Sequence, residues 1–175
     1  MSTIWKSDAT HSEITFKVRH MMISNVKGEF KEFDAEIVSE GDNFTQAKVK
    51  AVIKTDSIFT NNKDRDNHLR SADFFNAETY PEITFEGTSF EKLDEDNYKL
   101  HGDLSINGVT KNIALDVDFG GVGQDPYGNT KAGFTMSGKI NRTEFGLNWN
   151  QALEAGGLLV SEEVKINAEV QFVKQ

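Results

Sequence analysis

Apolar and polar residues alternate along most of the chain with a period of two. Between residues 13 and 20, Ile14, Phe16, Val18 and His20 share one parity, while charged and hydroxyl side chains take the other. A strand with one buried face gives this pattern, because successive side chains point to opposite faces. The alternation recurs over residues 47–53, 82–86, 100–106, 113–119, 132–140 and 164–172. The pattern predicts about eight mostly antiparallel strands.

The connections between these runs carry turn signals. Asn107-Gly108 lies between two alternating runs and suits the two positive φ angles of a type I′ hairpin. Residues 120–129 hold four glycines and a proline, which predicts a loop or a lid. The parity breaks between Phe30 and Phe33, where we expect a β-bulge.

One segment predicts a helix, from Asn62 to Ala72. Asn61 or Asn62 can cap its start, and Asp64 and Asp66 lie near the positive end of the helix dipole. Arg70 lies near the negative end. The rest of the chain predicts sheet, so the fold class is all-β with one short helix.

Eight antiparallel strands are compatible with two architectures, a sandwich and a closed barrel. Only a barrel removes exposed sheet edges. We therefore predict an antiparallel β-barrel in a single domain spanning residues 1–175. The lumen of such a barrel is filled by side chains or by one slender ligand. Gly28, Gly102 and Gly138 share the inward parity with large apolar residues. They either open a channel or relieve the curvature of the sheet, and the pattern favours neither.

Composition narrows the function classes. The net charge of −9 disfavours nucleic acid and an anionic membrane surface as partners. The chain contains no uninterrupted apolar stretch long enough to cross a bilayer, so we expect no stable membrane insertion. Thirteen of its residues are phenylalanine, whose rings carry no polar group and need burial or an apolar ligand. Cysteine is absent, which excludes disulfides and thiolate chemistry.

The start of the sequence bears on location. Residues 1–8 lack the basic segment, apolar run and small-residue cleavage site of a signal peptide. We expect a cytoplasmic protein.

Motifs for enzyme chemistry are missing from the sequence. It contains no nucleophile elbow, no His-Glu-x-x-His and no phosphate-binding glycine loop. Asp64-x-Asp66-x-His68 resembles the opening of a calcium loop, but Leu69 stands where that loop requires glycine. We therefore expect no catalytic residues, no cofactor and no metal.

The chain resembles the YceI-like family through motifs spread over nearly its whole length. They are Asp8-x-x-His11-Ser12-x-Ile14-x-Phe16-x-Val18-x-His20, Gly28-x-Phe30, Arg65-Asp66-x-His68-Leu69, Asp73-Phe74-Phe75, Tyr80-Pro81-x-Ile83-Thr84-Phe85, Gly102-Asp103-Leu104, Gly108-Val109-Thr110-Lys111 and Asn141-Arg142-x-x-Phe145-Gly146. The resemblance implies an extended lipocalin-like barrel that binds polyisoprenoids or other long-chain lipids, usually as a homodimer. Many members resemble periplasmic proteins with signal peptides, so that location is not carried over to this chain.

We expect the ligand to contact inward-facing and helix-proximal apolar residues together with His20. The candidates are Phe16, Val18, His20, Phe30, Ile53, Leu69, Phe74, Phe75, Phe85, Leu104, Ile106, Phe134 and Met136. A lone His on an apolar face is more often a hydrogen-bonded core residue, and we favour that interpretation of His20.

Three arginines are candidates for contact with a polar head group: Arg65, Arg70 and Arg142. A guanidinium matches a carboxylate or phosphate with two hydrogen bonds. Each is equally suited to a structural ion pair or a solvated surface.

The leading function is a non-catalytic carrier of a long apolar ligand. The alternatives are a stress-related structural protein without an obligatory ligand and an enzyme acting on an isoprenoid or fatty substrate.

Overall fold

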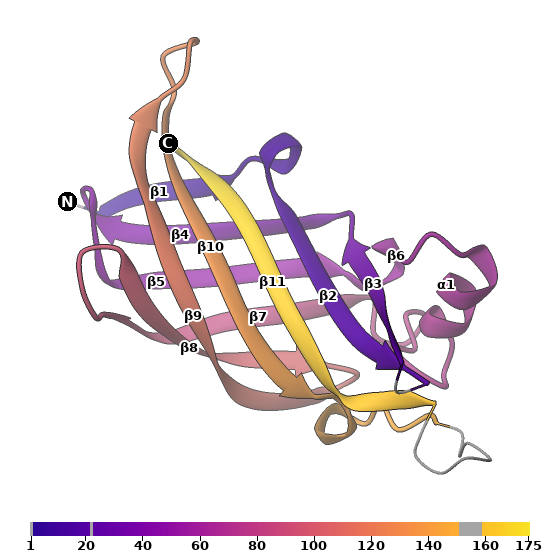
Figure 1. Ribbon diagram of the computed structural model, residues 1–175. Coiled ribbons are helices and arrows are strands. Elements are labelled where there is room, and N and C mark those ends of the chain that lie inside the picture. The colour runs from indigo at the N-terminus through magenta and orange to yellow at the C-terminus, as the bar shows by residue number, and fades with distance from the viewer. Residues whose placement is uncertain (1, 22, 151–158) are drawn as a thin grey trace.

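The computed structural model describes residues 2–21, 23–150 and 159–175, and Figure 1 shows a barrel with one helix at its side. The helix is α1 (Lys63–Arg70), and short 3-10 helices span Ala9–His11, Thr55–Ser57 and Arg142–Phe145. The strands are β1 (Ser2–Ser7), β2 (Glu13–His20), β3 (Ser24–Phe30), β4 (Phe33–Glu40), β5 (Asn43–Lys54), β6 (Ile58–Phe59), β7 (Glu82–Lys92), β8 (Asn97–Ile106), β9 (Val109–Gln124), β10 (Thr130–Asn141) and β11 (Val160–Lys174).

Eight strands close the barrel in the order β1-β4-β5-β7-β8-β9-β10-β11, with β11 pairing back to β1. All of these pairings are antiparallel. β11 meets β1 through residues 172–174 and β2 through residues 160–169. The strands β2, β3 and β6 therefore extend the wall beyond the ring. The prediction of an antiparallel barrel with a short helix is confirmed.

Local signals explain the helix and the tight hairpin. The Asn62 side chain caps α1 by accepting a hydrogen bond from the Arg65 backbone N–H at 3.0 Å. Asn107 and Gly108 both have positive φ, at 54° and 75°, and join β8 to β9. A type I′ turn needs these two angles, so the sequence signal is confirmed.

The bulge prediction between Phe30 and Phe33 is wrong. β3 ends at Phe30 and pairs with β2 and β6, whereas β4 begins at Phe33 and pairs with β1 and β5. The parity therefore changes because the chain crosses from one part of the sheet to another between Phe30 and Phe33. A register shift does occur elsewhere, between Gly133 and Phe134.

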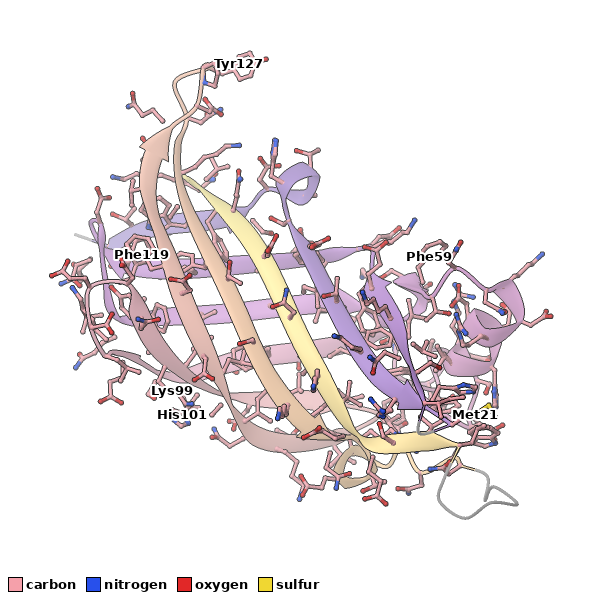
Figure 2. All side chains as sticks on the ribbon, in the orientation of Figure 1. Met21, Phe59, Lys99, His101, Phe119 and Tyr127 are labelled. Atoms are coloured by element: carbon pink, nitrogen blue, oxygen red, sulfur yellow. The ribbon has the colours of Figure 1, made fainter. Side chains whose placement is uncertain are left out.

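Residues 120–124 are strand, so the loop prediction is wrong for the first half of this segment. β9 runs to Gln124 and β10 starts at Thr130, so the two form a long hairpin that projects beyond the barrel (Figure 1). The Asp125 carboxylate fixes the turn by accepting hydrogen bonds from the backbone N–H groups of Tyr127 and Asn129. Tyr127 is 88% exposed at the tip (Figure 2).

An aromatic cluster fills one part of the interior, and we call it the aromatic plug. Ring centroids lie 5.1 Å apart between Trp5 and Phe44, 5.1 Å between Phe44 and Phe134, and 5.0 Å between Phe119 and Phe134. Phe90 stacks on Tyr98 at 4.7 Å and contacts Phe134 at 6.2 Å. The members are Trp5, Phe44, Phe90, Tyr98, Phe119 and Phe134. Offset and edge-on ring packing of this kind makes a solid core.

Candidate ligand-binding site

A cavity of about 620 Å³ lies inside the barrel. Its size lies within the range of pockets that bind small molecules, and its wall is overwhelmingly apolar. Inward-facing residues of β2, β3, β4, β5, β7, β8, β9, β10 and β11 form the wall, while α1 and the segment after it add residues at one side. The geometry suits a long apolar molecule.

The predicted contacts converge on this cavity with one exception. Residues lining it are Phe16, Val18, His20, Phe30, Ile53, Leu69, Phe74, Phe75, Phe85, Leu104, Ile106 and Met136. Phe134 instead belongs to the aromatic plug, where it contacts Phe44 and Phe119. The contact role of the predicted set stays a prediction.

Further lining residues were not predicted. Ile14, Ile83, Ile140, Val164, Ile166 and Ala168 line the cavity and continue the inward parity of strands that the alternation had already found. Trp149 also lines it, but from an irregular segment after the 3-10 helix Arg142–Phe145. No periodic pattern surrounds Trp149, so the alternation offered no signal for it.

Neighbouring side chains lie close against the inward glycines. A Cβ atom added to Gly138 would meet Leu115 Cδ2 at 2.6 Å, and one added to Gly102 would collide with the ring of Phe85. Neighbouring side chains therefore already fill the space that these glycines leave. Close packing of a curved wall explains these positions.

Three rings cluster at the side of the cavity next to α1. The ring of His68 meets Phe74 edge-on at 5.1 Å and Trp149 edge-on at 4.8 Å, and Phe74 lies 5.4 Å from Trp149. His68 Nε2 lies 2.9 Å from a carboxylate oxygen of Asp73. All three rings line the cavity, so an entering molecule would contact aromatic faces there.

Arg142 is a buried structural residue with 3% exposure. Its guanidinium donates hydrogen bonds to four backbone carbonyls, those of Leu147, Trp149, Val160 and Ser161. Burial lowers the pKa of Arg142 from its ordinary value. These bonds tie the Trp149 segment to the start of β11.

The other two arginines also donate to main-chain oxygens. Arg65 donates to the Thr60 hydroxyl at 2.8 Å and the Thr60 carbonyl at 2.6 Å. Arg70 donates to the carbonyls of Asp56 and Ile58. Arg65 and Arg142 line the cavity, whereas Arg70 is not among the lining residues.

The calcium-like motif forms the start of α1. The buried Asp66 carboxylate accepts hydrogen bonds from the Thr60 backbone N–H at 2.8 Å and its hydroxyl at 2.5 Å. Asp66 thereby holds the helix against the segment before it. Among residues 2–21, 23–150 and 159–175, no group of three or more His, Cys, Asp or Glu side chains is placed to hold a metal ion.

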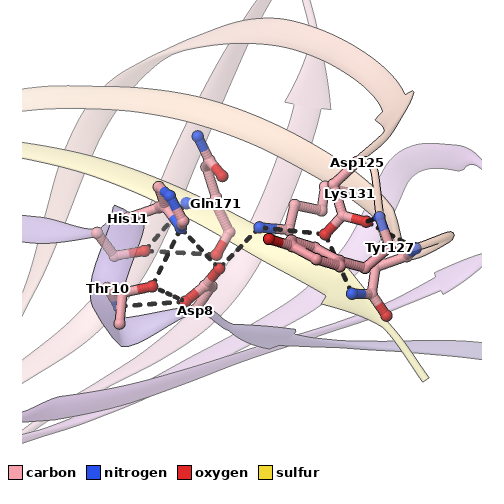
Figure 3. A network of polar contacts seen from close by, with 9 residues as sticks. Asp8, Thr10, His11, Asp125, Tyr127, Lys131 and Gln171 are labelled. Carbon is pink, nitrogen blue, oxygen red and sulfur yellow. Dashed lines mark hydrogen bonds and ion pairs between the residues drawn. The ribbon is translucent and has the colours of Figure 1, made fainter.

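A polar network outside the cavity joins the β1–β2 connection to the long hairpin (Figure 3). The Asp8 carboxylate contacts Lys131 Nζ at 2.8 Å, the Thr10 hydroxyl at 2.8 Å and His11 Nδ1 at 3.0 Å. The hydrogen bond from Lys131 is the main reason that the pKa of Asp8 falls far below its ordinary range. The pKa of Lys131 rises in return.

A closed antiparallel barrel with an apolar cavity defines a lipocalin-like barrel protein. The chain belongs to the YceI-like family, because residues 5–172 match the model of the YceI-like domain. It is 43% identical over 171 residues to a UPF0312 protein of Staphylococcus epidermidis, with 97% of each chain covered. A UPF0312 protein of Staphylococcus aureus is 40% identical over 166 residues, with 94% of each covered.

Solved structures share the fold. The YCEI protein of Campylobacter jejuni is 38% identical, with a TM-score of 0.77 and 90% of each chain covered. BcnA of Burkholderia cenocepacia superimposes with a TM-score of 0.80 at 22% identity, covering 94% of this chain and 98% of the other. A polyisoprenoid-binding domain from Saccharophagus degradans has a TM-score of 0.71 at 17% identity, with 98% of each covered.

In the part of this chain that the structure describes, no helix has the length and apolar character needed to span a membrane.

Proposed function

We propose that the protein is a non-catalytic carrier that holds the tail of a polyisoprenoid or related long-chain lipid inside the barrel. The apolar cavity of about 620 Å³ carries this proposal. A hydrocarbon chain that moves from water into such a cavity gains roughly 0.8 kcal/mol per buried CH₂ before ordering costs. The fold shared with the domain from Saccharophagus degradans, which is described as polyisoprenoid-binding, supports this ligand class.

Tail recognition should outweigh head-group recognition. Arg142 already donates to four carbonyls, and two donors of Arg65 are bound to Thr60. A guanidinium committed to the main chain has fewer donors left for a carboxylate or phosphate. The ligand is therefore selected mainly by the length and shape of its tail.

The enzyme alternative has weaker support. General acid–base catalysis needs a positioned titratable pair at the reacting group. His68, which lines the cavity, pairs with Asp73, but its ring lies among aromatic rings and Asp73 is exposed. The other alternative, a structural protein without a ligand, predicts a cavity that stays empty in the cell.

Two further expectations belong to this proposal. The family resemblance supports a homodimer, but the supply of phenylalanine does not, because Phe59 is the only one of the thirteen among the exposed large hydrophobic residues. Sedimentation at micromolar concentration tests the dimer. A cytoplasmic location is the second expectation, and fractionation of source cells tests it.

Native mass spectrometry of protein purified from its own source tests the carrier proposal. We expect an adduct that organic extraction releases and identifies as a long-chain lipid. Protein that carries no lipid, and that takes up none when mixed with polyprenol, would contradict the proposal and favour the structural alternative.

A further inference from the structure

Four lysines form one continuous row across the outer wall of the barrel. Lys139 on β10 pairs with Lys165 on β11, Lys165 pairs with Lys17 on β2, and Lys17 pairs with Lys27 on β3. We call Lys139, Lys165, Lys17 and Lys27 the lysine row. With strands about 4.8 Å apart, the row spans roughly 14 Å.

The row has no rationale in the stability of the sheet. Like charges directly opposite each other on neighbouring strands destabilise the pairing. Among the described residues, no ion pair engages the ammonium groups of Lys17, Lys27 or Lys165, and Lys139 has only an exposed contact of 3.8 Å with Glu163. The row therefore presents positive charge to a partner outside the chain.

Lysines are concentrated in one part of this wall despite the overall negative charge. Further along the same strands, toward the aromatic plug, Asp118, Thr135, Glu169 and Glu13 form a parallel row with three acids. An open groove of about 920 Å³ runs over the wall. All four lysines line it, together with Thr15, Ser137 and Asn167 and with two acids, Glu29 and Asp116. Lysines therefore outnumber acids in this groove by four to two, although the net charge of the chain is −9.

Exposed apolar side chains lie at the end of the same strands. Met21 and Ile23 connect β2 to β3 and are 43% and 77% exposed. Met21 lies at the end of β2 beside the start of β11 (Figure 2), and its backbone N–H donates to the Leu159 carbonyl at 2.7 Å. Leu159 and His20 both line the cavity. The apolar connection is thus next to the cavity.

We propose that the wall of β10, β11, β2 and β3 docks reversibly on a membrane surface that carries anionic phospholipids. The lysine row faces lipid phosphates, and Met21 and Ile23 contact the boundary of the acyl chains. Basic residues next to exposed apolar ones are typical of proteins that lie at a membrane interface. A soluble anion would match the lysines but would leave the apolar connection without a role. The docking proposal rests on these observations and not on the proposed carrier function. For a lipid carrier, docking would hold the cavity close to the membrane that supplies the ligand.

Sedimentation with vesicles tests docking directly on the full chain without added ligand. We expect binding to vesicles of equal parts phosphatidylcholine and phosphatidylglycerol, weakening as salt rises, and little binding to phosphatidylcholine alone. At about 1 kcal/mol per lysine, the double variant Lys17→Gln/Lys165→Gln should lower the partition coefficient roughly thirtyfold. The matched control Lys48→Gln/Lys92→Gln removes two exposed lysines outside the row and should bind like the wild type.

Ile23→Ser separates the two parts of the surface. It should weaken binding to the anionic vesicles about tenfold while leaving the salt dependence unchanged, because it removes apolar contact and no charge. Unchanged melting temperatures would show that all variants are folded. Equal binding to neutral vesicles, or wild-type binding by Lys17→Gln/Lys165→Gln, would overturn the proposal. Calorimetric binding of tripolyphosphate without any vesicle binding would also overturn it and assign the row to a soluble anion. None of these results depends on whether the cavity holds lipid.

Discussion

The ring of Phe16 lies across Gly28 on the neighbouring strand, so that a Cβ atom on Gly28 would collide with the ring carbons. Phe16 faces the cavity and contacts Phe30, whose ring centroid is 5.7 Å away, and Phe30 in turn meets Phe75 edge-on at 5.8 Å. The missing side chain at Gly28 thus sets the position of the first ring in a series that leads to the segment after α1.

Gly28→Ala should therefore displace Phe16 from its place. Overpacking a filled site typically costs about 1 to 3 kcal/mol, and we expect a loss of this size in the free energy of unfolding measured with urea. The control is Gly133→Ala on β10, where nothing lies within 4 Å of the added Cβ, and it should change stability little. Combining Gly28→Ala with Phe16→Leu should restore part of the loss. If Gly28→Ala were as stable as Gly133→Ala, the ring would not be held by the glycine.

Arg142→Met tests whether this arginine serves structure or ligand. The substitution removes the donor to four carbonyls and leaves buried acceptors unsatisfied, each costing about 1 to 3 kcal/mol. We expect a large drop in melting temperature, or failure to fold. Arg142→Lys should also be destabilised, because an ammonium has three donors and a different geometry. An Arg142→Lys variant with wild-type stability that has lost lipid would instead assign Arg142 to the head group.

The Asp8 network predicts a pH dependence. In the folded chain Lys131 lowers the pKa of Asp8 below its ordinary value of 3.8, so the unfolded chain binds the proton more readily. The network's stabilisation is therefore complete above pH 3.8 and is lost as the pH falls toward the lower folded pKa. At pH 7, Asp8→Asn should cost about 1 kcal/mol of unfolding free energy, because charge-assisted hydrogen bonds are lost.

Urea unfolding at several pH values checks this prediction, and the difference between wild type and Asp8→Asn should shrink in acid. Asp116→Asn is the control, because its ion pair with Lys99 at 2.7 Å is exposed and contributes little. A difference between wild type and Asp8→Asn that stayed constant into strong acid would contradict the linkage.

Alternation predicted most strands that have several inward apolar positions, but it missed β4, where Phe33, Ala35 and Ile37 pack against the core. It also failed where such positions are few. β1 has one buried apolar side chain, Trp5, next to the exposed Ile4, so no alternating run marks it. Parity also indicates on which face of the sheet a residue lies, but it does not indicate where along the barrel axis that residue lies. Phe134 and Met136 share the inward face of β10, yet the first lies in the aromatic plug and the second lines the cavity.

The site was harder to predict than the fold, because its boundaries depend on contacts between distant segments. The sequence marked Phe74 and Phe75 as apolar residues next to a helix, and both line the cavity. Trp149, which contacts Phe74, lies in an irregular segment held by Arg142, and only the three-dimensional arrangement brings these residues together. The same holds for the lysine row, whose members come from four strands.

Ala51→Phe tests whether the cavity accommodates a ligand. Ala51 lines the cavity from β5, between Ala35 on β4 and Phe85 on β7. A phenylalanine here stays apolar but takes up volume that a lipid tail would use. If the cavity is open, the variant should stay folded and retain shorter tails, while long-tailed ligands bind more weakly.

Val52→Phe is the matched control, because it adds the same ring one residue along β5, at a position that does not line the cavity. It should leave lipid retention unchanged. Melting temperature and retention of a polyprenol length series, measured on both variants and the wild type, separate the outcomes. An Ala51→Phe protein destabilised by about 1 to 3 kcal/mol, beside a wild type that retains no lipid, would show a filled core instead of a binding cavity. We expect the affinity of the wild type to rise with each added isoprenoid unit and then to level off, because each further buried CH₂ contributes until the cavity is full. The point at which the affinity levels off would give the length of tail that the barrel accepts.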